Sequence, residues 1–83
     1  MDKTLPNAVD HQEYQIKPMP MKIIVEGAER WNSKLEIWKH SCSESTVFQF
    51  CGKPTFKAKE EAIKYCFNAG KHIIDNEPEK LIQ

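Results

Sequence analysis

The feature that most constrains the fold of this chain is one long stretch with helical periodicity, Lys57 to Asp75 (KAKEEAIKYCFNAGKHIID). Two neighbouring rows of small or apolar residues recur along it at i, i+4 and i+7 spacing and form one broad stripe. Asn76 and Pro78 follow the stretch and predict its end. The stretch therefore predicts a helix that packs on a surface supplied by the preceding residues. The stripe consists of Ala62, Ile63, Cys66, Phe67, Ala69, Gly70, Ile73 and Ile74.

Three short segments upstream predict strands. Met21–Glu26, Lys34–Lys39 and Thr46–Cys51 contain β-branched and aromatic residues, and short polar or glycine-containing connections separate them. Such connections favour antiparallel pairing of consecutive strands. The sequence therefore predicts an α+β fold in which one C-terminal helix packs on one face of a three-stranded antiparallel meander.

The two ends of the chain carry weaker signals. Residues 1–20 are polar, lack helical periodicity and hold three prolines, so they predict a flexible N-terminal arm. The alternating run Tyr14–Ile16 would fit an added edge strand, although the prolines after it argue against a continuous ladder. Residues 77–83 predict a C-terminal tail that is either frayed or a short extra element pairing with an edge, which leaves residues 21–76 as the folded domain. An 83-residue chain buries a modest core, so dimerisation would stabilise it.

Charge and cysteine content limit the environment of the protein. Twelve basic residues balance twelve acidic ones, which gives no global electrostatic case for binding nucleic acid or a membrane. Residues 30–59 are nevertheless basic, with six Lys and Arg against two Glu. Three cysteines without C-x-x-C spacing and an N-terminus without an apolar run predict a cytoplasmic protein with reduced thiols. Cys66, which lies on the helical stripe, is expected to be a small buried hydrophobic residue.

The sequence predicts neither a catalytic centre nor a metal site. It contains no nucleophile motif, glycine-rich phosphate loop or H-E-x-x-H. Cys66 and His72 are six residues apart on the predicted helix and therefore lie on different faces. His40 and Cys42 flank one turn, but no third group orients the histidine, and with Cys51 they lack the regular ligand spacing of structural zinc sites. We therefore expect no catalytic residue, cofactor or metal ion.

The residues of the second predicted strand divide between two faces. Trp38 points to the opposite side from Leu35 and Ile37, so one helix cannot cover both sets. An apolar face would then remain exposed, which is typical of a partner surface, unless the ends of the chain cover it. The preferred interpretation is a non-enzymatic protein-interaction module that binds an unknown protein or a second copy. Its expected contact residues are Trp38, Trp31 and Ile24.

Two motifs carry a resemblance to known domains. Gly52–Ala62 (GKPTFKAKEEA) leads from an aromatic residue at the last strand into an E-E-A helix, and Gly70–Asp75 (GKHIID) ends that helix in an apolar-Asp step. Together with the order strand, strand, strand, helix over Met21 to Asp75, they resemble a class of small bacterial domains. The resemblance implies the fold given above and no assigned activity.

The same outline is similar to two kinds of nucleic-acid module. One is the three-stranded, single-helix domain of plant-type transcription factors and integrase arms, and the other is the double-stranded RNA-binding fold. This chain departs from both, because its strands are not rich in Arg and Trp and its N-terminal arm shows no helix. The first resemblance implies an alternative function, nucleic-acid binding through the sheet by Arg30, Lys34, Lys39 and Trp38. Such binding needs several basic groups on one face.

Overall fold

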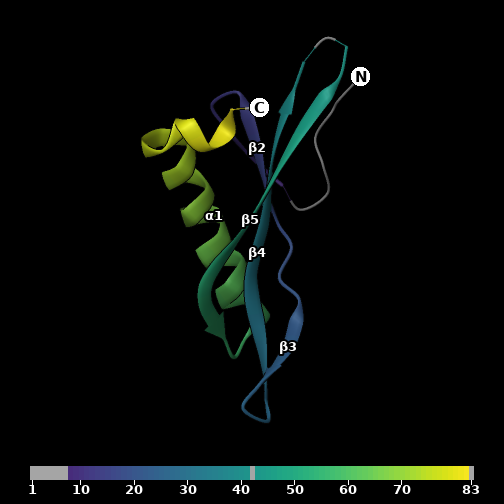
Figure 1. The fold of residues 1–83 in the computed structure, drawn as a ribbon, viewed down its shortest axis with the longest axis vertical. Coiled ribbons are helices and arrows are strands. Elements are labelled where there is room, and N and C mark those ends of the chain that lie inside the picture. Colours follow the sequence, from purple (N-terminus) through teal and green to yellow (C-terminus); the bar gives the residue numbers. More distant parts are fainter. Residues whose placement is uncertain (1–7, 42, 83) are drawn as a thin grey trace.

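The structure, a computed structural model, describes residues 8–41 and 43–82. Figure 1 shows a twisted antiparallel sheet with one α-helix lying along one face. The α+β class, the antiparallel sheet and the C-terminal helix are confirmed. The elements are β1 (Val9–His11), β2 (Tyr14–Pro18), β3 (Lys22–Val25), β4 (Ala28–His40), β5 (Ser45–Phe56), α1 (Lys59–Asn76) and the 3-10 helix η1 (Pro78–Leu81).

Strand β4 organises the sheet. It pairs with β5 along one side and with both β2 and β3 along the other. Ile16 lies opposite Ile37, and Lys22 lies opposite Trp31, so β2 and β3 follow one common register on β4. Strand β1 adds to the outer side of β2. The described residues thus form five strands, which corrects the predicted three-stranded meander.

The expected N-terminal arm contains two of these strands. β1 and β2 both lie within residues 1–20, and Ile16 of β2 is completely buried. The prediction of a flexible arm is therefore wrong for residues 9–18. Residues 1–7 lie outside the described part of the chain. The alternation of polar and apolar residues in Tyr14–Ile16 correctly indicated a strand. Pro18, which argued against a continuous ladder, nevertheless pairs with Leu35 of β4.

Helix α1 buries the stripe that its periodicity predicts. It packs on Ile16, Leu35 and Ile37, which are at most 1% exposed, and on the partly buried rings of Phe48 and Phe50. Leu35 and Ile37 therefore face the helix, and Trp38 faces the other way. Cys66 is fully buried, as predicted. The buried residues of α1 are Ala62, Cys66, Gly70, Ile73 and Ile74.

Gly70 allows α1 to lie close to β2. A Cβ atom added at Gly70 would stand 2.7 Å from Cγ2 of Ile16, closer than real Cβ atoms approach their neighbours. The absent side chain therefore sets the separation between the helix and the strand. This contact fixes α1 over β2 and β4.

The C-terminal residues do not form a simple tail. Residues Pro78–Leu81 form the 3-10 helix η1, and Leu81 is 7% exposed and belongs to the hydrophobic core. The backbone N–H of Glu77 donates to the carbonyl of Ile73 at 2.9 Å, which joins the end of α1 to this turn. The predicted tail at residues 77–83 is thus corrected to a short element packed on α1.

Candidate functional site

The sheet face opposite α1 differs from the apolar surface that we expected. Trp38 Nε1 donates to Glu36 Oε1 at 3.0 Å, and Gln49 Nε2 donates to Glu36 Oε2 at 3.2 Å. Glu36 is only 9% exposed, so these donors satisfy a carboxylate that is largely removed from water. Trp38 thus belongs to a polar network. The same face also carries Val47 and Cys51, so apolar and polar side chains are mixed on it.

A second polar chain continues across this face. Gln15 Nε2 donates to Asp10 Oδ1 at 2.9 Å, which leaves Gln15 Oε1 to accept from His40 Nε2 at 2.8 Å. His40 Nδ1 lies 2.7 Å from Ser45 Oγ. A serine beside a histidine is the start of a nucleophilic site, but catalysis also needs a cleft that holds a substrate. His40 and Ser45 line neither of the two grooves described below.

Trp31 and Ile24 lie on the side of the sheet that α1 occupies, near the start of the helix. The ammonium groups of Lys22 and Lys59 stand 5.6 and 5.5 Å from the Trp31 ring, within cation–π range. Ile24 is 67% exposed. Because Trp38 points to the opposite face, the three expected contact residues do not form one surface.

The basic residues of the alternative function are also divided. Arg30 donates from Nε to Thr55 Oγ1 at 3.1 Å and from Nη2 to the carbonyl of Thr55 at 2.8 Å. Lys39 alternates with Ile37 on the helix side, and its Nζ lies 3.6 Å from Glu13 Oε2. Arg30 and Lys34 lie with Trp38 on the opposite face, so Lys39 is the one of these three basic residues that does not share it.

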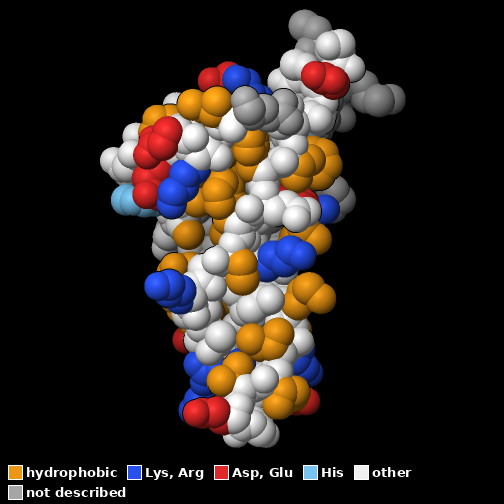
Figure 2. Space-filling view, viewed as in Figure 1, with side chains coloured by type: hydrophobic (Ala, Val, Ile, Leu, Met, Phe, Trp, Pro, Cys, Tyr) orange, Lys and Arg blue, Asp and Glu red, His pale blue; other side chains and the backbone are white. Residues whose placement is uncertain are grey.

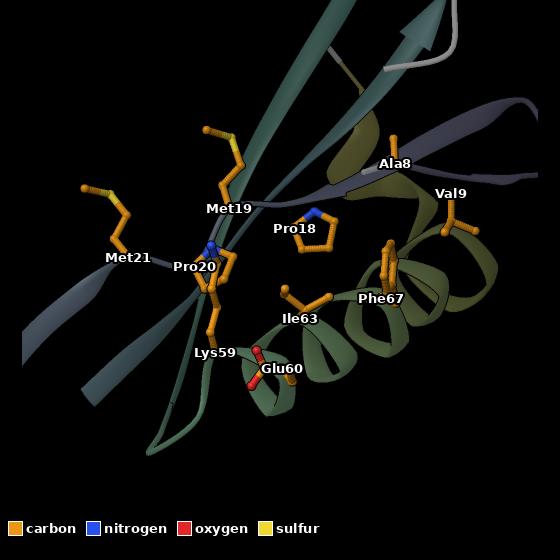
Figure 3. A pocket seen from close by; sticks show the side chains of 10 residues that line it. All are labelled: Ala8, Val9, Pro18, Met19, Pro20, Met21, Lys59, Glu60, Ile63 and Phe67. Carbon is orange, nitrogen blue, oxygen red and sulfur yellow. The ribbon is translucent and has the colours of Figure 1, made fainter. Parts of the chain in front are cut away.

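An apolar groove lies between α1 and the segment that joins β2 to β3. Its volume is about 650 Å³. Figure 3 shows Ile63 and Phe67 of α1 facing Pro18, whereas Met19 and Met21 point away from the helix. The charged residues of the groove stand at the start of α1. The lining residues are Ala8, Val9, Pro18, Met19, Pro20, Met21, Lys59, Glu60, Ile63 and Phe67.

Two prolines determine the outer edge of this groove. The amide of Met19 donates to the carbonyl of Lys34 at 2.8 Å, so Met19 faces β4. Alternation in an antiparallel ladder turns the backbone groups of its neighbours, Pro18 and Pro20, away from β4. Proline has no N–H, so both positions offer only a carbonyl to an incoming strand. Among the described residues, Val9 is the first of β1 that pairs with β2, and it lies opposite Ile16.

A second groove lies between β5 and α1, with a volume of about 480 Å³. Phe50 stands on its strand side, and Tyr65 and Ile73 stand on its helix side. A Cβ atom at Gly52 would approach Tyr65 Cε1 to 3.0 Å, so glycine brings the end of β5 close to the helix. Figure 2 shows hydrophobic side chains on the surface between α1 and the strands.

The two described cysteines differ in chemistry. Burial, reinforced by the nearby Cys51, raises the pKa of the Cys66 thiol to about 11. Its Sγ lies 3.4 Å from the carbonyl of Lys34. At neutral pH the Cys66 thiol is therefore protonated and a poor nucleophile. Cys51 is exposed, and Cys42, considered above with His40, lies outside the described residues.

Within residues 8–41 and 43–82, no group of three or more His, Cys, Asp or Glu side chains is arranged to hold a metal ion. No α-helix in the same residues is long and apolar enough to cross a membrane. No protein-family model, curated protein or solved structure matches this chain.

The groove beside α1 could not be read from the sequence. Ile63 and Phe67 belong to the predicted helical stripe, but Pro18-Met19-Pro20 indicated only an interruption. The groove exists because the tertiary fold brings these segments, more than 40 residues apart, to opposite walls. The one local signal was the apolar residue Met19 between the two prolines.

Proposed function

We propose that the protein is a non-enzymatic protein-interaction module whose groove between α1 and residues 18–21 receives an apolar segment of a partner protein. The observation that most directly supports this proposal is the exposure of apolar side chains in the groove and on the adjacent strand β3. Val9, Met21, Ile24 and Val25 are between 38% and 67% exposed. Exposed apolar side chains that adjoin a groove are typical of a protein-binding site.

The backbone of the same edge supports an extended partner segment. Asn32 N donates to the carbonyl of Met21 at 3.0 Å, so Met21 faces β4 and the backbone groups of Lys22 and Ile24 face outward. The backbones of Lys22 and Ile24 can both donate and accept hydrogen bonds, whereas those of Pro18 and Pro20 can only accept them. An extended segment that pairs with Lys22 and Ile24 would place alternate side chains toward the groove.

Selection from a random peptide library on the purified protein, followed by fluorescence anisotropy with one selected peptide, tests this function. We expect apolar peptides to be enriched and Met21→Glu to weaken binding about tenfold or more. Ile82→Glu is the matched control, because Ile82 is 73% exposed and lines neither groove. Peptide-induced amide shifts should concentrate at residues 18–24 and 59–67.

Two results would contradict the proposed function. In the first, the selected peptide binds Met21→Glu and the wild-type protein with equal affinity. In the second, its amide shifts cluster on the face that carries Trp38. The second result would instead favour the expectation drawn from the sequence.

A further inference from the structure

The outer side of β2 continues past the described end of its pairing with β1. The first described pair of β1 is Val9 with Ile16. Met19 faces β4, so the backbones of Pro18 and Pro20 face outward, and each offers a carbonyl without an N–H. A segment that fits this edge must therefore place N–H donors at two alternate positions, and it needs no acceptor opposite the prolines.

The residues that precede β1 reach this part of the edge when the register of the β1–β2 pairing is continued. Antiparallel partners step in opposite directions, so a step of two residues before Val9 brings Asn7 opposite Pro18. A second step of two residues brings Leu5 opposite Pro20. The chain therefore carries, directly before β1, a segment that can face both carbonyls.

The sequence of this segment supplies the donors that the edge requires. Leu5 and Asn7 stand at positions whose backbones would face β2, and both have an N–H to donate. Pro6 stands between them, at a position whose backbone would face away from β2, where no donor is needed. The proline of the segment therefore costs no hydrogen bond with β2.

The same register directs one apolar side chain toward the groove beside α1. Pro18 lies opposite Leu35, which packs under the helix, so residues opposite Pro18 and Pro20 also point to the helix side. Leu5 is one of these residues. Figure 3 shows Ala8 at one end of the groove and Pro20 at the other, so a strand that extends from Ala8 toward Pro20 crosses the groove.

We propose that residues 5–7 extend β1 along residues 18–20 and place Leu5 in the groove, against Ile63 and Phe67. Both helix residues are half-buried, so the leucine side chain removes further apolar surface from water. Attachment to β1 favours this segment over an occupant from solution, because it gives an effective concentration on the order of millimolar.

The extended strand occupies the groove that the proposed function assigns to an apolar segment of a partner protein. The partner must then displace Leu5, so its apparent affinity falls with the fraction of molecules whose groove is open. This regulatory role rests on the proposed function, whereas the extension of β1 stands without it.

Amide hydrogen exchange, followed by NMR on the full chain, tests the extended strand. The amides of Leu5 and Asn7 should exchange at least about tenfold more slowly than in an unstructured peptide of the same sequence. Thr4 and Ala8 are the controls, because their N–H groups face away from β2 in this register and should exchange freely. Equal exchange at all four residues, or protection only at Thr4 and Ala8, would overturn the proposal.

Two substitutions that add the same charge test the position of Leu5. Leu5→Asp should withdraw the side chain from the groove and move the amide signals of Ile63 and Phe67. Thr4→Asp is the matched control, because its side chain points to the other face of the sheet in this register and should leave both signals in place. Equal shifts in the two variants would contradict the position of Leu5.

Titration of the selected peptide tests the regulatory role. Leu5→Asp should bind the peptide about threefold or more tightly than the wild-type protein does, and Thr4→Asp should keep the wild-type affinity. Unchanged affinity in Leu5→Asp would overturn the regulatory role. Protected amides at Leu5 and Asn7 without any selected peptide would contradict the proposed function alone. A selected peptide together with freely exchanging amides would contradict the strand extension alone.

Discussion

The two edges of the sheet flank the same strand, β4, but they differ in the residues whose backbone groups face outward. The β2–β3 edge has prolines at positions 18 and 20, whose backbone groups face outward, and β1 covers its beginning. Gly70 of α1 packs directly on Ile16 of this edge. The β5 edge has hydrogen-bonding residues at its outward positions and partly buried aromatic rings beside them.

This difference indicates two kinds of recognition. Prolines remove backbone donors, so a partner at the β2–β3 edge must be selected mainly by its side chains in the groove. The β5 edge offers a full row of donors and acceptors, so it can be recognised by the backbone of another strand. One edge therefore favours recognition by side chains, and the other favours recognition by the backbone of an extended segment.

The largest effect should come from truncating the packed edge. Ile16 is fully buried between the sheet and α1, so Ile16→Ala should lower the free energy of unfolding by about 2–5 kcal/mol. Val47→Ala, at the half-exposed β5 edge, should cost less than about 1 kcal/mol. Urea denaturation at a concentration where the protein is monomeric measures both. Equal losses would show that the two edges are packed alike.

A smaller loss is expected when the contact between α1 and β2 is crowded. Replacing glycine by alanine inside a helix ordinarily stabilises it by about 1 kcal/mol. In Gly70→Ala the added carbon meets Ile16, and overpacking of this kind costs about 1–3 kcal/mol. Thermal unfolding should therefore show net destabilisation. Asn68→Ala, an exposed change in the same helix, should instead raise the melting temperature slightly. A rise for Gly70→Ala would mean that α1 can move away from β2.

Replacing the prolines of the β2–β3 edge should restore its outward N–H donors and make this edge resemble the β5 edge. Pro18→Val/Pro20→Val should destabilise the chain by about 0.4–1 kcal/mol per site, because proline restricts the unfolded state. The variant should also self-associate more than the wild-type protein does, since both edges would then offer outward N–H groups. Light scattering at rising concentration measures this association. Pro78→Ala, which removes a proline from η1 and not from the sheet, serves as the control and should leave the mass unchanged.

The smallest expected effect concerns stability, because the rate of cysteine alkylation reports on the exposure of the β5 edge without changing stability measurably. Raising the pKa of Cys66 from 9.0 to about 11 leaves about a hundredfold less thiolate at pH 8. In a Cys42→Ser background, iodoacetamide should therefore modify Cys51 at least about tenfold faster than Cys66, and Cys66 should gain reactivity as the pH approaches 11. Mass spectrometry of tryptic peptides follows both rates.

Some residues carried enough local information to be placed in advance. The row that includes Ala62, Cys66 and Ile73 was predicted to be buried, and it is. The alternation around Leu35 and Ile37 correctly separated them from Trp38. Pro18 misled because its effect depends on the direction of its backbone. The hydrogen bond from Trp38 to Glu36, two residues away on the same face, was not anticipated. Neither relation is visible in composition.

The sequence by itself determined α1 and its buried stripe, because a period of 3.6 residues is a local property of the chain. It also determined that strands precede this helix, since alternation and β-branched residues are local signals as well. Only the tertiary structure decided which edge is protected and which is open. Whether an outward position holds a proline or a donor depends on the register with β4, and a shift of one residue would reverse every position.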